Sequence, residues 1–258
     1  MFREFSSLTV RTEPEATVIT LKRPERRNAL SLEMMTELLD SLVTCSRDAG
    51  VRTIIIAAAG KVFCSGHDLQ ELAGAGSDHR RIFDTCAELM LKLQTTPQPV
   101  IAEVQGLATA AGCQLVAACD LAIAGDDAAF ATPGVKIGLF CTTPMVPLVR
   151  AIGRKRAMEM LLTGQPISSR TAFEWGLINR VVPQSHLSSA TRELAAIIAT
   201  ASRETIAAGK RAFYEEIAMD DRSAYSHAGN EMTANASTPD AREGIAAFLS
   251  KRTPVWRP

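Results

Sequence analysis

Short, uninterrupted runs of β-branched and other apolar residues recur along the chain, separated by segments of helix length. Thr53-Ile54-Ile55-Ile56 and Val100-Ile101-Ala102-Glu103-Val104 are two such runs, and residues 120–124 form a third. Strands buried on both faces have this composition, because helices cover both sides of a parallel sheet. Between two of the runs, residues 78–93 carry apolar side chains at helical spacing. The pattern therefore predicts an α/β fold built on parallel strands.

The two ends of the chain differ from this central part. Residues 17–21 alternate in polarity, which is typical of an antiparallel strand pair. The last third is mostly helical, and Thr238 followed by Pro239 is the start signal of a final helix. We predict a core over residues 1–200 and a helical C-terminal region over residues 201–258.

Charge and composition exclude several classes of protein. The 28 basic and 28 acidic side chains give zero formal net charge, so no basic excess favours nucleic acid or an anionic membrane as a partner. No apolar run approaches the roughly 20 residues that span a bilayer. The first residues lack the pattern of a secretion signal. We expect a cytoplasmic globular protein.

The six cysteines form no CxxC pair, and none has a histidine at metal-ligand spacing. No metal site is expected. Four of them lie in apolar patterns and are interpreted as buried hydrophobic residues of a protein in a reducing compartment. Cys64 and Cys141 flank glycine-containing loops, so a chemical role stays open for both.

Two segments share one local design, in which a turn of small residues precedes a helix. They are residues 63–69 and residues 105–113. Such a turn leaves backbone N–H groups unpaired, and the start of a helix adds positive potential. Two N–H groups that converge on one oxygen form an oxyanion hole. The alternative is that both are tight packing turns of the kind glycine commonly makes.

These turns belong to an ordered series of motifs that resembles the enoyl-CoA hydratase/isomerase (crotonase) family. The motifs are Phe63-Cys64-Ser65-Gly66-His67-Asp68-Leu69, Cys113-Gln114-Leu115, Cys119-Asp120-Leu121-Ala122-Ile123-Ala124, Phe130-Ala131-Thr132-Pro133 and Gly176-Leu177-Ile178-Asn179-Arg180-Val181-Val182-Pro183. The match is collinear and covers essentially the whole chain. Residues 65–68 and 138–141 resemble one particular subgroup of the family.

The resemblance implies a crotonase-like spiral of repeated ββα units with a helical C-terminal trimerisation region. It implies homotrimers, often paired into hexamers, and acyl-CoA thioesters as ligands, with no permanently bound cofactor. By position, the backbone N–H groups of Ser65 and Ala111 would form the oxyanion hole.

The resemblance also implies which residues bind the CoA thioester. The basic loop around residue 25 would contact the CoA phosphates, as would a lysine after the last helix, from the same or a neighbouring subunit. The alternative for this loop is a solvated charged surface. The implied substrate-binding residues are Lys22, Arg23, Arg26, Arg27, Ala29, Leu30, Gly66, His67, Asp68, Leu69, Gly112 and Lys251.

The sequence departs from the family at two catalytic positions. Hydration of an enoyl thioester needs a base that activates water and an acid that protonates the α-carbon, and the hydratases use two glutamates. Gln114 and Gly134 stand at those positions. A glutamine forms hydrogen bonds but cannot act as a base. Efficient enoyl-CoA hydration is therefore not expected.

Other side chains offer replacements. Cys141 is a candidate nucleophile, and the alternative is a small residue that shapes the pocket. His67 is a candidate proton shuttle, although we expect it to point away from the acyl group. Asp68 is expected to cap a helix, and Asp120 to fix a turn. The predicted function is acyl-CoA thioester processing. The alternatives are a non-catalytic acyl-CoA-binding protein, or a thioester hydrolase or decarboxylase that uses a different group.

Overall fold

The structure is a computed structural model that describes residues 2–74 and 76–257. Its larger sheet has five parallel strands, and two antiparallel strands extend one edge. In spatial order they are β1 (Phe2–Glu4), β2 (Leu8–Thr12), β3 (Thr17–Leu21), β4 (Ile54–Ala58), β6 (Val100–Val104), β8 (Leu121–Gly125) and β11 (Arg180–Val182). The predicted parallel sheet and the antiparallel N-terminal pair are confirmed.

A second, smaller sheet lies along the first. In order it contains β10 (Ile167–Ser168), β9 (Ala129–Ala131), β7 (Leu107–Thr109) and β5 (Val62–Cys64), of which the last three are parallel. The chain passes from the larger sheet to the smaller one three times, from β4 to β5, from β6 to β7 and from β8 to β9. Each passage is followed by a helical segment, which confirms the expected spiral of ββα units.

Eleven α-helices and three 3-10 segments lie in the described residues. The helices are α1 (Leu32–Arg47), α2 (Leu69–Ala73), α3 (His79–Thr95), α4 (Ala111–Ala118), α5 (Thr142–Ile152), α6 (Arg154–Thr163), α7 (Ser169–Trp175), α8 (Leu187–Ala199), α9 (Arg203–Glu216), α10 (Asp221–Ala236) and α11 (Pro239–Leu249). The 3-10 segments are η1 (Pro24–Arg26), η2 (Pro133–Ile137) and η3 (Gln184–His186). Thr238 caps α11 as predicted, accepting a hydrogen bond from the N–H of Ala241 at 3.2 Å. No helix in the described residues is long and apolar enough to cross a membrane.

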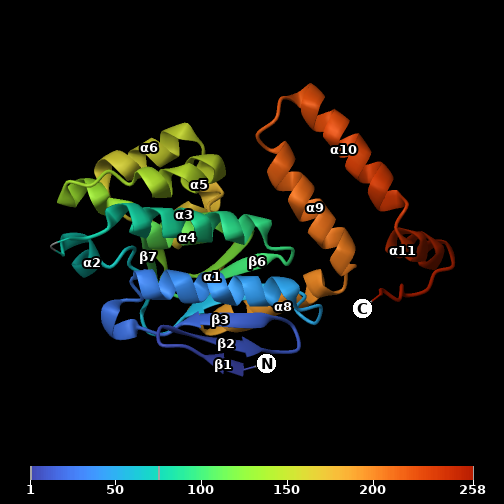
Figure 1. Ribbon diagram of the computed structural model, residues 1–258, viewed down its shortest axis with the longest axis horizontal. Helices are drawn as coiled ribbons and strands as arrows, with labels where there is room; N and C mark the ends of the chain where they lie inside the picture. Colours follow the sequence, from blue (N-terminus) through green and yellow to red (C-terminus); the bar gives the residue numbers. More distant parts are fainter. Residues whose placement is uncertain (1, 75, 258) are drawn as a thin grey trace.

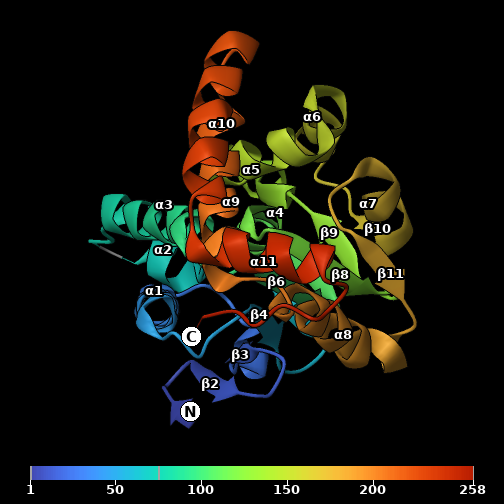
Figure 2. The same ribbon diagram turned by 90° about the vertical axis from the view of Figure 1, so that its right-hand side faces the viewer.

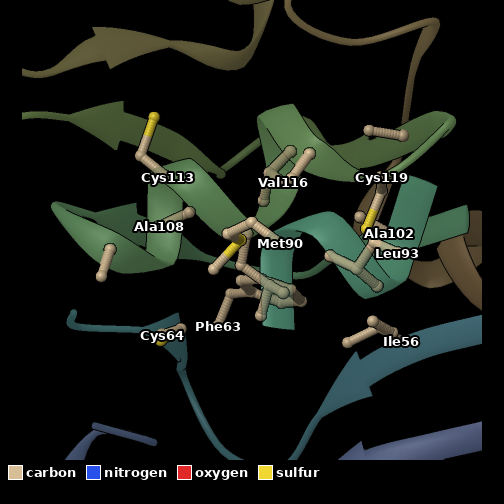
Figure 3. Close-up of a cluster of buried hydrophobic side chains, with 14 of the residues drawn as sticks. Ile56, Phe63, Cys64, Met90, Leu93, Ala102, Ala108, Cys113, Val116 and Cys119 are labelled. Atoms are coloured by element: carbon tan, nitrogen blue, oxygen red, sulfur yellow. The ribbon is translucent and has the colours of Figure 1, made fainter. Parts of the chain in front are cut away.

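The core lies between the sheets and the helices that cover them. Figure 3 shows part of it, where Met90 and Leu93 of α3 lie close to Val116 of α4 and Ala102 of β6. Burial of such apolar side chains supplies most of the driving force for folding. This packing holds the C-terminal ends of β5 and β7 in place, and both turns singled out in the sequence begin there.

The last three helices contribute no residue to this hydrophobic core. Figures 1 and 2 show α10 and α11 at one end of the molecule, with α9 between them and the sheets, while α2 lies at the opposite end. Neither α9 nor α10 contains a buried residue. The helical C-terminal region predicted from the sequence is present.

Candidate active site

The two glycine-containing turns meet at Gly66. Its φ of 91° is in the left-handed region, where glycine has no steric penalty. A Cβ atom at this position would lie 2.8 Å from the Cβ of Ala110 and 3.2 Å from the backbone nitrogen of Ala111. Only glycine therefore allows the turn after β5 to rest against the start of α4.

The second turn contains a strained residue. Ala110 precedes α4 with φ 52° and ψ −121°, and no side chain caps this helix. Positive φ is unfavourable for alanine, and such outliers persist where the surrounding structure enforces them, often at functional sites. Ala111 is the first residue of α4, so its N–H has no acceptor within the helix. The strained turn thus leaves this N–H available beside Gly66.

The first turn provides a different donor from the one expected. The N–H of Ser65 donates to the carbonyl of Arg27 at 3.1 Å, so it is not available to a ligand. Within the described residues, the backbone N–H of His67 has no hydrogen-bond acceptor. The expectation for Ser65 is therefore wrong, and the two unpaired donors flanking Gly66 are those of His67 and Ala111.

Both turns open into a cavity of about 650 Å³, a size typical of small-molecule sites. The turns contribute Ser65, His67, Thr109, Ala110 and Ala111 to its wall. Helices α2 and α3 contribute Leu69, Leu72 and Phe83. The remaining wall comes from residues 133–144, chiefly Pro133, Gly134, Lys136, Ile137, Leu139, Phe140 and Cys141. The wall is mostly apolar, and no residue that the structure describes there carries a carboxylate.

Neither glutamate-replacing position offers a proton carrier. Gln114 is buried and does not line the cavity, and the Sγ of Cys86 lies 3.8 Å from its Oε1. Gly134 does line the cavity, but the loop after η2 occupies the space beside it. A Cβ atom at Gly134 would overlap the carbonyl oxygen of Leu139 and lie 2.8 Å from the Sγ of Cys141.

Cys141 and His67 both line the cavity. Burial raises the pKa of the Cys141 thiol, so the reactive thiolate is scarce at neutral pH. This geometry favours the pocket-shaping interpretation of Cys141.

His67 was expected to point away from the acyl group, yet it forms part of the cavity wall. Its ring packs edge-on against Phe83, with the centroids 5.3 Å apart. Burial lowers the pKa of His67, so the imidazole is neutral near pH 7. Both ring nitrogens are shielded from solvent and have no partner among the described residues.

The basic loop is fixed to the first turn by backbone hydrogen bonds. The N–H of Leu30 donates to the carbonyl of Gly66 at 2.7 Å, and the N–H of Asp68 donates to the carbonyl of Leu30 at 3.3 Å. The side chain of Leu30 is fully buried, and Ala29 is nearly so. Both side chains belong to the protein interior, so the expected contact of these two residues with adenine or pantetheine would involve their backbone.

The four basic side chains of this loop differ in availability. Lys22 pairs with Glu4 at 2.5 Å, Arg23 donates to Ser31, and Arg26 donates to the side chain of Gln70. Arg27 is exposed and has no side-chain partner in the part of the chain that the structure describes. Arg27 is thus the cation of this loop that is free to meet a phosphate.

The remaining candidates have other positions. Asp68 caps α2 as expected, accepting from the N–H of Gln70 at 3.0 Å. Gly112 packs against the backbone of Cys64, where a Cβ atom would overlap the carbonyl oxygen, so it does not line the cavity. Lys251 follows α11 with φ 51° and lies outside the cavity. The described residues contain no group of three or more side chains suited to hold a metal ion.

Sequence reasoning missed the apolar wall of the cavity. Leu72, Phe83 and Ile137 line it, but none stands in a motif that carries chemistry. Apolar side chains on a helix or after a proline predict packing equally well. The fold alone shows that these three meet.

The chain belongs to the enoyl-CoA hydratase/isomerase family, whose family model matches residues 12–258. Within this family it is similar to the enoyl-CoA hydratase domain-containing protein 3 of Rattus norvegicus. The two are 50% identical over 240 residues, which cover 92% of this chain and 80% of the relative. The subgroup resemblance of residues 65–68 and 138–141 is confirmed.

Solved structures agree with this assignment. The crystal structure of the human enoyl-CoA hydratase domain-containing protein 3 has a TM-score of 0.94 and 45% identity, and covers 97% of this chain and 100% of that one. An enoyl-CoA hydratase of Mycobacterium smegmatis has a TM-score of 0.94 and 45% identity, with coverage of 98% and 99%.

The comparisons contradict the expected cytoplasmic location. The rat, mouse and human relatives are all named as mitochondrial proteins. The expectation relied on the lack of a secretion pattern, and that pattern reports only on export. It cannot separate one compartment inside the cell from another.

Proposed function

We propose that this chain binds acyl-CoA thioesters and polarises their carbonyl with the backbone N–H groups of His67 and Ala111. The observation that supports this most directly is the pair of unpaired donors flanking Gly66 at the wall of an apolar cavity. Such donors stabilise negative charge as it develops on the thioester oxygen. Arg27, on the loop that is hydrogen-bonded to the same turn, is proposed to contact a CoA phosphate.

The proposed chemistry does not depend on activated water. Gln114 lies outside the cavity wall, and Gly134 has no room for a side chain. A polarised carbonyl still assists loss of CO2 from a 2-carboxyacyl thioester. In that step the bond from the α-carbon to the carboxylate breaks, its electron pair forms the enolate, and solvent then protonates the α-carbon. The donors at His67 and Ala111 would stabilise this enolate.

The test is mass spectrometry of thioesters incubated with the protein in heavy water. We expect 2-carboxyacyl thioesters to lose CO2 and gain deuterium at the α-carbon, while 2-enoyl thioesters gain no water. Cys141→Ala should retain turnover, because the proposed step does not use the thiol, whereas a route through a thiol nucleophile would be abolished. Rapid hydration of 2-enoyl thioesters would contradict the proposal.

A second candidate is a binding protein without catalysis. The observation that favours it is the lack of any acidic proton carrier among the described residues of the cavity wall, where Lys136 is the one charged side chain. An unchanged panel of thioesters, together with calorimetric evidence that they bind, would select this function.

The helical region over residues 201–258 is proposed to be the subunit contact that forms trimers or hexamers. It presents large exposed apolar side chains on α10 and α11, of the kind that oligomer interfaces cover. Lys251 would then meet a CoA phosphate only across such an interface, because α11 lies at the opposite end of the molecule from α2 (Figure 1).

A further inference from the structure

Four apolar residues of the cavity wall are open to solvent. Leu69, Ile137, Leu139 and Phe140 all line the cavity, yet between 40% and 59% of each residue's surface is exposed. We call these four residues the apolar collar. Exposed apolar side chains gathered at one place mark a binding surface more often than chance, because water solvates them poorly. The collar therefore needs an apolar occupant.

The wall inside the cavity is apolar as well. Leu72, Phe83 and Pro133 lie in its wall, so apolar surface is present both within the cavity and at its rim. Lys136 is the one wall residue with a permanent charge in the described chain. The Cε atom of Lys136 lies close to Gly164, 3.2 Å from where a Cβ would stand at that glycine. The stem of this lysine thus adds methylene surface while its ammonium group can reach water.

We propose that the acyl group of the ligand carries a long hydrocarbon chain, with no polar group beyond the α-carbon, that leaves the cavity across the apolar collar. This inference rests on the proposed function, which places the thioester carbonyl at His67 and Ala111. A short acyl group at that point would leave the collar exposed to water. A long chain would cover it, and each methylene group removed from water favours binding by about fourfold.

Other occupants of the apolar collar would give a different dependence of affinity on the acyl chain. The pantetheine arm of CoA, or a neighbouring subunit, would cover the collar whatever acyl group is attached. A chain with a terminal carboxylate would instead be held by the ammonium group of Lys136. The length and the terminal group of the acyl chain therefore separate these possibilities.

The experiment is isothermal titration calorimetry with acetyl-, octanoyl- and lauroyl-CoA, each below its micelle concentration. For the unaltered protein we expect affinity to rise with chain length, with a binding heat capacity that becomes more negative as more apolar surface is buried. Leu139→Ser and, separately, Ile137→Ser should weaken lauroyl-CoA about tenfold and acetyl-CoA less than about twofold. Two separate variants are used in case one of them misfolds, and circular dichroism shows whether each is folded.

Leu162→Ser is the matched control. Leu162 on α6 is also exposed, at 58%, but it lies outside the cavity wall, so its substitution should leave all three affinities unchanged. Equal losses for acetyl- and lauroyl-CoA in the collar variants would overturn the inference in favour of the CoA arm or a subunit. Tighter binding of ω-carboxylauroyl-CoA than of lauroyl-CoA would overturn it in favour of Lys136. Failure to bind any thioester would instead refute the proposed function itself.

Discussion

The absence of a side chain at residue 134 shapes the cavity as much as any side chain does. The carbonyl of Leu139 and the sulfur of Cys141 occupy the volume that a Cβ at Gly134 would need. A catalytic glutamate is therefore not simply missing at this position, because the loop that replaces it is closely packed. Restoring the carboxylate requires that loop to move, and tightly packed regions resist such movement.

We therefore predict that Gly134→Glu, alone or with Gln114→Glu, does not create hydratase activity. The introduced side chain should lower the free energy of unfolding by roughly 1–3 kcal/mol, the usual cost of overpacking. Urea denaturation measures the stability, and loss of enoyl-thioester absorbance measures hydration. The matched control is Gly209→Ala in α9, where a Cβ meets no atom within 4 Å, so stability should stay the same or rise slightly. Efficient hydration by the double variant would contradict the prediction, because it would show that the loop holding Leu139 and Cys141 moves aside for the glutamate.

At Ala110, in the same site, we predict a substitution that raises the free energy of unfolding. Its backbone conformation costs an alanine about 1–3 kcal/mol, and a glycine adopts it freely. We expect Ala110→Gly to raise the free energy of unfolding by about 1 kcal/mol, since the relief of strain exceeds the extra entropy of the unfolded chain. The urea midpoint should rise at constant slope. Thioester affinity should persist, because the N–H of Ala111 keeps its place; a fall in both stability and affinity would mean that the Ala110 methyl group is needed for packing.

Among the elements, α9 is attached to the core by an ion pair whose two side chains are largely shielded from solvent. The ammonium group of Lys210 donates to Asp120 at 2.6 Å, to the carbonyl of Leu93 at 2.8 Å and to the carbonyl of Gln98 at 2.9 Å. Asp120 also accepts from the hydroxyl of Tyr214 at 2.8 Å. The side chains of Lys210 and Asp120 are only 8% and 16% exposed. Every proton of the ammonium group thus has a partner, and the end of α3 is joined to α9.

Removing one member of this pair should be costly. We predict that Lys210→Met lowers the free energy of unfolding by about 3–5 kcal/mol, because a buried carboxylate loses its counter-charge. Adding Asp120→Asn should recover part of the loss, as expected for residues in one network. Thermal and urea denaturation of both single variants and the double variant measure this coupling. Strictly additive losses would show that Lys210 and Asp120 act independently.

The sequence predicted elements better than it predicted their contacts. Local signals identified α11 through Thr238 and Pro239, and the β-branched runs identified β4 and β6. Asp120 was expected to fix a turn, but its side chain instead accepts from the N–H of Val100, the first residue of β6, at 2.7 Å. Its partner Lys210 is 90 residues away in the sequence, and no local pattern could pair the two.

At the candidate site too, local sequence patterns could not predict contacts between distant segments. The motifs located both turns, but the choice between Ser65 and His67 depended on a hydrogen bond to Arg27, on a different loop. The assignment of Gln114 and Gly134 to the positions of the usual glutamates rests on their place in the motifs and stays a prediction. That Gln114 lies outside the cavity wall, and that a loop fills the space beside Gly134, follows from packing alone.

On the scale of the whole molecule, the C-terminal helices expose more apolar surface than a lone chain would favour. Phe248 and Leu249 of α11 are 84% and 76% exposed, and Figure 2 shows α10 extending beyond the rest of the protein. A stable interface buries at least about 1,000 Å² of total surface and places apolar side chains at its centre. We therefore expect this region to be covered by other copies of the chain.

We predict that light scattering on a sizing column gives the mass of a trimer or hexamer for the unaltered protein. Phe248→Ser together with Leu249→Ser should shift that mass toward the monomer, because serine removes the apolar surface that favours association. Phe2→Ser is the control: Phe2 is 66% exposed, but it lies on β1 at the edge of the larger sheet, so the assembly should be unchanged. A monomeric mass for the unaltered protein at micromolar concentration would contradict the prediction, and Lys251 would then have no neighbouring subunit in which to bind a phosphate.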